Sequence, residues 1–149
     1  MIASTAGLRV ARTGQIVSSN APALAAFVRR RGGEAHVLPI ARDDSDALRG
    51  LAKAAAGADL LVTSGGASVG EHDLVRSALG VDGLKLDFWQ IAMRPGKPLM
   101  FGKLGALPLL GLPGNPVSNL VCATLFLAPI LATLLGRPDP LPKPEMAIL

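Results

Sequence analysis

The chain has 149 residues, of which half are hydrophobic and 3% aromatic, and its net charge is +4 from 15 basic and 11 acidic side chains. This length suits one domain with a full core built from Ala, Leu, Val and Ile. Few rings are available to stack on bases, and the basic residues form no dense stripe, so the composition argues against nucleic-acid binding. A mild positive charge suits an anionic small molecule.

Strand and helix patterns alternate over the first half of the chain. The helices are short and the connections tight, so this βαβαβ spacing predicts parallel strands with helices on both faces of the sheet. The predicted segments are a strand at Met1–Thr5, a helix at Ala21–Arg31, a strand at Ala35–Ile40, a helix at Asp46–Ala56, a strand at Asp59–Thr63 and a helix at Leu74–Leu79.

The second half begins with three extended segments, Lys85–Ala92, Leu99–Lys103 and Ala106–Leu110. Leu104-Gly105 between the last two predicts a hairpin, which makes the sheet mixed. A final helix follows at Pro116–Leu135. We therefore expect one domain over residues 1–136 and a proline-rich tail over residues 137–149, and a linker of this kind usually leads to a further domain.

A single cysteine, Cys122, has apolar neighbours and cannot form an internal disulfide, so we expect a buried thiol in a reducing, cytoplasmic compartment. The N-terminus lacks the features of a signal peptide. The apolar stretch Val117–Leu135 is long enough to span a membrane, but polar residues and Pro129 interrupt it. We therefore expect a buried helix and no membrane contact.

The loop Thr63–Asp73 contains three glycines and follows a predicted strand. Glycines permit positive φ and close ligand approach, and successive N–H groups before a helix favour an anion. Glu71 and Asp73 would repel a phosphate unless a cation lay between them, so the loop predicts an anion bound with Mg²⁺ or another hard metal. The alternative is a glycine-rich turn whose acids cap the next helix.

Other loops at the carboxyl ends of predicted strands also carry polar groups, and ligands of open α/β sheets bind at these ends. Arg94 and Lys97 flank a rigid Pro-Gly turn, which suits an anion clamp or, alternatively, a solvated turn. The segment Pro113–Ser118 fixes the start of the last helix with Asn115 as a plausible N-cap, and it could equally contact a ligand.

Asp43 follows the second strand and could join Glu71 and Asp73 around Mg²⁺. His36 and His72 form no zinc signature. The string around Ser68 matches a nucleophile elbow, but no acid–histidine pairing supports a hydrolase.

Together the loops resemble the molybdopterin-binding domain of the molybdopterin molybdotransferases, of the gephyrin E-domain type. The resemblance covers nearly the whole chain, from about Ser4 to Gly136. The matching segments, in family order, are Gly14–Asn20, Asp43-Asp44, Thr63–Asp73, Arg94–Pro98 and Gly111–Ser118.

The resemblance implies a three-layer α/β/α domain that binds the phosphate of a pterin dithiolene. In the family, molybdate is transferred to adenylylated molybdopterin with Mg²⁺-assisted loss of AMP, and related domains associate as dimers or trimers. By resemblance Asp43 and Asp73 would be catalytic, and both would hold the metal with Glu71. The implied cofactor-binding residues are Thr5, Ser19, Asn20, Gly65, Gly66, Ser68, Gly70, Arg94, Gly96, Lys97, Pro113, Gly114, Asn115, Pro116 and Ser118.

The chain departs from the family pattern at several positions. Acids are missing in the segment Ala6–Leu8, Ser18 replaces a usual aspartate, and Gln90 stands where a lysine is common. Catalytic competence is therefore left open. The alternatives are a non-catalytic pterin- or nucleotide-binding module of the same fold, and a molybdopterin adenylyltransferase.

Overall fold

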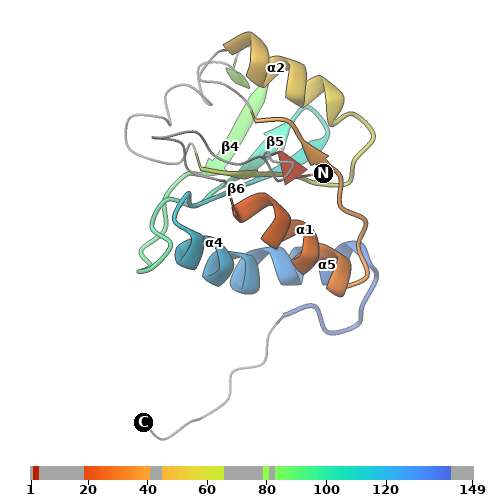
Figure 1. Ribbon diagram of the computed structural model, residues 1–149, viewed down its shortest axis with the longest axis vertical. Coiled ribbons are helices and arrows are strands. Elements are labelled where there is room, and N and C mark those ends of the chain that lie inside the picture. Colours follow the sequence, from red (N-terminus) through yellow and green to blue (C-terminus); the bar gives the residue numbers. More distant parts are fainter. Residues whose placement is uncertain (1, 4–18, 41–44, 66–78, 81–82, 142–149) are drawn as a thin grey trace, which may run out of the picture.

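The structure is a computed structural model that describes residues 2–3, 19–40, 45–65, 79–80 and 83–141. Within these residues six strands form one sheet in the order β2-β1-β3-β6-β5-β4 (Figure 1). The strands are β1 (Ile2–Ala3), β2 (Val37–Leu38), β3 (Leu61–Ser64), β4 (Leu84–Phe88), β5 (Met100–Leu104) and β6 (Leu107–Leu112).

Strand direction decides which loops can meet. β1 pairs in parallel with β2 and β3, and β3 pairs in parallel with β6. β5 runs antiparallel to both β4 and β6, so β4 points the same way as β6. The mostly parallel, mixed sheet predicted from the sequence is confirmed. The carboxyl ends of β3, β4 and β6 consequently lie at one edge of the sheet, where ligands of such folds bind.

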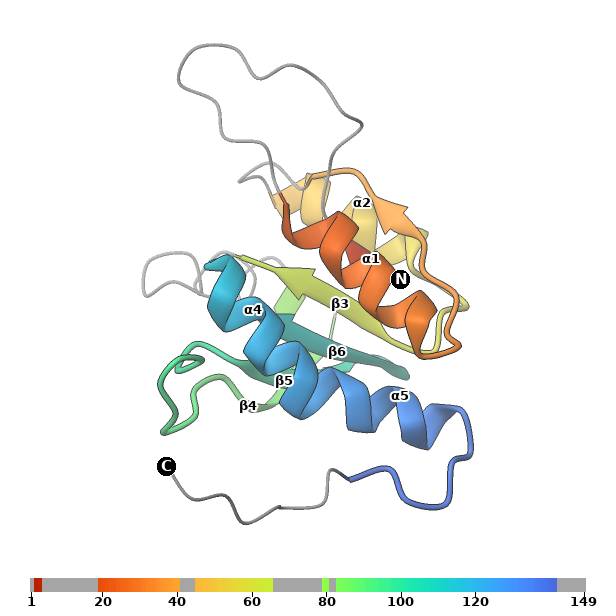
Figure 2. The same ribbon diagram turned by 60° about the horizontal axis from the view of Figure 1, so that its bottom comes forward.

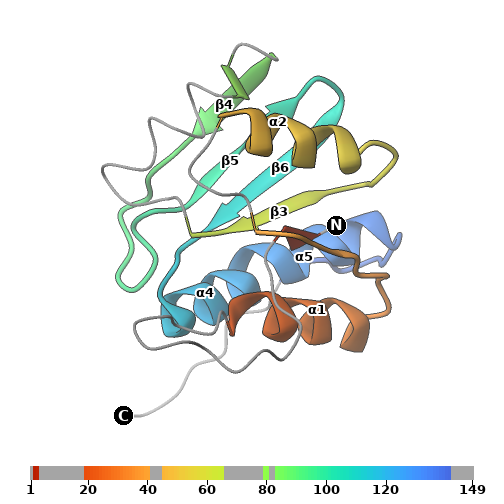
Figure 3. The ribbon, with the colours of Figure 1, turned by 45° about the horizontal axis from the view of Figure 1, so that its top comes forward.

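Helices cover both faces of the sheet, as Figures 2 and 3 show. Helix α1 (Asn20–Arg30) and the C-terminal helical run lie on one face, and α2 (Ser45–Ala54) lies on the other. Buried residues form two clusters that match these two faces: one contains Leu24, Val62 and Leu127, and the other contains Leu61 and Leu109. Alternating residues of β3 thus point to opposite cores, which confirms the three-layer α/β/α architecture.

The C-terminal helical run has three parts. They are α4 (Pro116–Cys122), a π-helical turn η1 (Ala123–Leu127) and α5 (Ala128–Leu134). The sequence predicted one uninterrupted helix over this stretch. Pro129 lacks an N–H and its ring would clash with the carbonyl four residues earlier in a regular α-helix, and a widened turn before it relieves that clash.

The run Pro116–Leu134 is long and apolar enough to span a membrane by length and composition. Only 28% of its most apolar 18-residue stretch is buried. One face packs on the sheet through Asn119, Cys122 and Leu127. The opposite face leaves Val117 and Leu120 exposed. The expected buried helix is therefore buried along one face only.

Several segment bounds differ from the sequence-based expectation. The strand predicted at Ala35–Ile40 forms a ladder only at Val37–Leu38, and the one predicted at Lys85–Ala92 ends at Phe88. The hairpin is confirmed, with Leu104 paired to Leu107. The predicted helix Leu74–Leu79 lies outside the described residues except for its last residue.

Truncation of Leu127 should test the packing of the helical run. Its side chain is fully buried, whereas Leu125 in the same turn is 42% exposed. Leu127→Ala should lower the free energy of unfolding by about 2–5 kcal/mol because it leaves a cavity in a close-packed core. Leu125→Ala is the matched control and should cost less than about 1 kcal/mol. Urea unfolding measures both, and equal losses would contradict the packing described.

Candidate functional site

Two asparagines join three chain segments at the carboxyl edge of the sheet. The side-chain nitrogen of Asn20, at the start of α1, donates to the hydroxyl of Ser64 at 2.8 Å and to the carbonyl of Gly114 at 2.7 Å. The side-chain nitrogen of Asn119, in α4, donates to the same hydroxyl at 2.9 Å and to the carbonyl of Pro113 at 2.9 Å. We call Asn20, Ser64 and Asn119 the amide network. It fixes the end of β3 between two helices and the loop after β6.

The loop after β3 touches the loop after β6 directly. The N–H of Gly65 donates to the carbonyl of Leu112 at 3.1 Å, which extends the β3–β6 ladder by one step. Gly65 has φ of +82°, and a Cβ on Gly114 would lie 3.3 Å from the Gly65 Cα. Glycine is thus favoured at both positions, by the positive φ at Gly65 and by the close approach of the two backbones at Gly114. The site edge presents main chain rather than side chains at this point.

Helix α4 begins with the cap that the sequence predicted. The Asn115 side chain accepts hydrogen bonds from the N–H groups of Val117 at 3.0 Å and Ser118 at 3.1 Å, and Pro116 occupies the first turn. The Ser118 hydroxyl lies 3.4 Å from the same oxygen. Capping therefore accounts for the geometry of Asn115, and its predicted contact with a ligand stays a prediction.

The loop between β4 and β5 brings two cations to the same edge. Arg94 and Lys97 are both exposed, and neither forms an ion pair within the part of the chain that the structure describes. Main-chain hydrogen bonds within the loop fix its conformation, because the Lys97 carbonyl accepts from the N–H groups of Ile91 and Leu99, each at 3.1 Å. The main chain is thus anchored while the two charged side chains remain available to an anion.

Gly96 lies between these cations and is buried. Its φ is +120°, and a Cβ there would lie 2.4 Å from the Met93 Cε and 2.7 Å from the Cys122 Sγ. The loop therefore packs on the C-terminal helical run through glycine. Burial also raises the pKa of the Cys122 thiol, so the thiol stays protonated and acts as a small apolar side chain, as the sequence predicted.

The predicted site residues are distributed unevenly over the structure. Asn20, Pro113 and Gly114 meet through the amide network, and Gly65 lies beside it through its bond to Leu112. Arg94, Gly96 and Lys97 share one loop at the same edge. Ser19 precedes α1, is exposed and makes no side-chain cap. Asn115, Pro116 and Ser118 form the start of α4. The other predicted residues lie outside the described residues: Thr5, Asp43, Gly66, Ser68, Gly70, Glu71 and Asp73.

The predicted Mg²⁺ site cannot be built from the described residues. Its three carboxylates, Asp43, Glu71 and Asp73, belong to segments that are not described. The described residues contain no group of three His, Cys, Asp or Glu side chains able to hold a metal ion. The magnesium assignment therefore stays a prediction.

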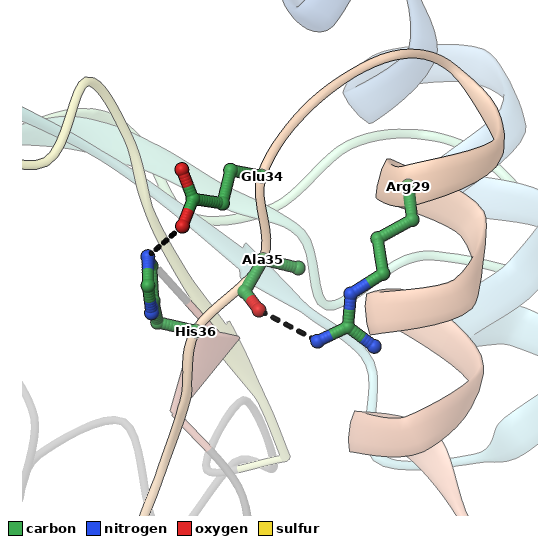
Figure 4. Close-up of polar contacts among 4 residues, drawn as sticks. All are labelled: Arg29, Glu34, Ala35 and His36. Atoms are coloured by element: carbon green, nitrogen blue, oxygen red, sulfur yellow. Dashed lines mark hydrogen bonds and ion pairs between the residues drawn. The ribbon is translucent and has the colours of Figure 1, made fainter.

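The opposite edge of the sheet has a different chemistry (Figure 4). There Arg29 of α1 donates to the carbonyl of Ala35 at 2.8 Å, and the His36 Nε2 lies 2.8 Å from the Glu34 carboxylate, with both side chains exposed. A cavity of about 370 Å³ lies at this edge, between the C-terminal ends of α1 and α5. None of the predicted site residues lines it, so we do not assign the pterin ligand to it.

Sequence reasoning missed two members of the amide network, Ser64 and Asn119. In the sequence, Ser64 is only a polar residue at the end of a strand, and Asn119 is only a polar residue inside an apolar helix. Asn119 is 1% exposed, and a buried asparagine in a helix of this composition usually has hydrogen-bond partners. That rule signals that partners exist without saying which they are.

Fold and site together define an α/β domain that offers glycine-rich turns and exposed cations at the carboxyl edge of a mostly parallel sheet. Residues 2–133 match the family described as "Probable molybdopterin binding domain", and the chain belongs to that family.

Relatives of known name agree with this assignment. The chain is 42% identical over 127 residues to a molybdopterin molybdenumtransferase of Nostoc, covering 83% of this chain and 29% of that protein. It is 38% identical to molybdopterin molybdenumtransferase 2 of Mycobacterium tuberculosis, covering 91% of this chain and 35% of that protein. The chain thus spans about a third of the length of these curated relatives.

A solved structure extends the similarity to three dimensions. The molybdopterin biosynthesis MoeA protein of Pyrococcus horikoshii superposes with a TM-score of 0.76 at 34% identity. The match covers 91% of this chain and 34% of that one. The three-layer fold is therefore that of one domain of a larger relative.

Replacement of Gly96 should show how tightly the cationic loop is held. Gly96→Ala should lower the free energy of unfolding by about 2–4 kcal/mol, because it combines a positive φ with overlap on Met93 and Cys122. Gly83 also has positive φ, +88°, but faces open space. Gly83→Ala is therefore the control for strain alone, with an expected loss of about 1–2 kcal/mol. Equal losses in urea unfolding would show that Gly96 is not packed as described.

Proposed function

We propose that this chain binds the phosphate-bearing pterin of molybdenum cofactor synthesis at the carboxyl edge of its sheet. The observation that carries the proposal is that the Gly65 and Gly114 turns and the exposed Arg94 and Lys97 all lie at that edge. Two cations at this edge suit a phosphate, because they supply opposite charge and charge-assisted hydrogen-bond donors. The family assignment and the names of the relatives support the same ligand class.

We further propose that the domain contributes to molybdate insertion into adenylylated molybdopterin, and relatives named molybdopterin molybdenumtransferase support this reaction class. Gly65, with Gly66, Ser68 and Gly70, would surround the phosphate, and Arg94 and Lys97 would neutralise it. The turn from Pro113 through Gly114, Asn115 and Pro116 to Ser118 would shape the pocket beside Thr5, Ser19 and Asn20. Asp43, Glu71 and Asp73 would hold Mg²⁺, which when bound would neutralise charge on a pyrophosphate.

Two features of the chain support a second candidate function. The chain spans about a third of its curated relatives, and acids usual in the family are replaced at Ala6–Leu8 and Ser18. These losses favour a non-catalytic pterin-binding module as the second candidate, because fewer acids would weaken metal and molybdate handling more than phosphate binding. A cytoplasmic location and a homo-oligomer, dimer or trimer, without nucleic-acid or membrane partners, belong to the same proposal.

Binding of molybdopterin, or its adenylylated form, tests the ligand assignment. Trp89 is the only tryptophan and lies in the β4–β5 loop, so its fluorescence can follow a titration with and without Mg²⁺. We expect tighter binding with Mg²⁺, and about fivefold to tenfold weaker binding for Lys97→Gln because one charged contact to phosphate is lost. Lys103→Gln is the control. Lys103 is exposed and lies near the end of β5, which starts at the carboxyl edge and runs away from it. No binding in either metal condition would overturn the proposal.

Replacement of Asp73 distinguishes a catalytic domain from a non-catalytic pterin-binding module. In the absence of Mg²⁺, Asp73→Asn should leave pterin binding within about threefold of the unaltered chain, because the phosphate is then held by the cations and not by this carboxylate. Molybdate-dependent release of AMP from adenylylated molybdopterin should disappear. Chromatographic quantification of AMP measures this. The unaltered chain should release AMP slowly, and its failure to release any would favour the module.

A further inference from the structure

The amide network fixes which way its two asparagines face. A main-chain carbonyl oxygen can only accept hydrogen bonds, so the atoms facing the carbonyls of Pro113 and Gly114 must be the amide nitrogens of Asn119 and Asn20. Each NH₂ group has one further proton. Both remaining protons point to the hydroxyl oxygen of Ser64, at 2.8 Å and 2.9 Å.

Ser64 is consequently restricted to one role toward a ligand. A serine hydroxyl has two lone pairs and one proton, and both lone pairs of Ser64 accept from amides. The Ser64 hydroxyl makes no other hydrogen bond within the described residues. The proton occupies the remaining tetrahedral position, away from both amides, at the end of β3 where the side chain is partly exposed.

We propose that Ser64 donates its hydroxyl proton to an anionic phosphate oxygen of the ligand, and that it does not bind the metal. The inference rests on the pterin-phosphate function proposed above and adds a residue to that site. A metal ligand must offer a lone pair, and Ser64 has none left, whereas a phosphate oxygen needs a donor. Asn20 and Asn119 are positioning residues that act through Ser64.

The burial of the network supports this reading. Asn20 is 9% exposed and Asn119 1%, so neither NH₂ group can exchange its hydrogen bonds for water at low cost. The Oδ1 of Asn119 is buried and without a hydrogen-bond partner among the described residues. Within the described part of the chain, only the NH₂ group of the Asn119 side chain makes hydrogen bonds, and one of them uses a lone pair of the Ser64 hydroxyl oxygen.

A pair of probes tests the proposal: 6-hydroxymethylpterin and its phosphate monoester. Affinities are measured by Trp89 fluorescence with and without Mg²⁺. Ser64→Ala should weaken binding of the phosphate ester about tenfold, the usual effect of losing a hydrogen bond to a charged group, and leave the unphosphorylated pterin unchanged. Ser64→Thr keeps the hydroxyl and should restore binding. The ratio of affinities with and without Mg²⁺ should be the same in Ser64→Ala as in the unaltered chain.

Several outcomes would overturn it. If Ser64→Ala abolishes the Mg²⁺ effect, Ser64 is a metal ligand, and if it weakens both pterins equally, its role is structural. Ser64→Ala leaves two buried amide protons unpaired, so circular dichroism checks its fold. Should it unfold, Ser64→Cys replaces it, since a thiol keeps the shape but donates weakly.

Inorganic phosphate separates this inference from the proposed function. If the unaltered chain binds neither pterin but binds phosphate in a Ser64-dependent manner, the pterin function fails and the role of Ser64 stands. If the chain binds neither pterin nor phosphate, both are wrong.

Discussion

The geometry of the candidate site depends on two buried amide groups that have no alternative partners. Asn20 and Asn119 each divide their two protons between a loop carbonyl and Ser64. The loop after β6, the end of β3 and the starts of two helices are thereby held in one arrangement. Removing the Asn119 amide would leave the buried Pro113 carbonyl unpaired, which costs more than the hydrogen bond itself contributes. The two glycine turns can approach each other only because this frame is fixed.

Much of the fold could be predicted because it follows from local patterns. The alternation of strands and helices predicted the parallel strands. Gly105 indicated the hairpin that makes β5 antiparallel to β6. That the loops after β3, β4 and β6 lie at the same edge followed from strand direction alone. The N-cap at Asn115 was equally local, since it involves residues two and three positions away.

The rest depended on contacts between distant residues. Ser64 and Asn119 are 55 positions apart, and no periodicity connects a strand end to a helix interior. The π-helical turn reflects how Pro129 is accommodated, and the pattern of apolar residues does not distinguish it from a regular helix. Gly96 was predicted as a ligand contact from its motif, and its burial against Cys122 shows a packing role as well. The roles of Asp43, Glu71 and Asp73 stay predictions.

The reversed direction of β5 has an evolutionary consequence. Because β4 arrives at the carboxyl edge and β5 leaves from it, the segment bearing Arg94 and Lys97 starts and finishes on one side of the domain. Its length and sequence can therefore change without altering the order of any strand. A crossover segment could not vary so freely, since it must traverse the sheet. Divergence of ligand preference within this architecture should accordingly concentrate in residues 89–99, while the frame beneath them persists.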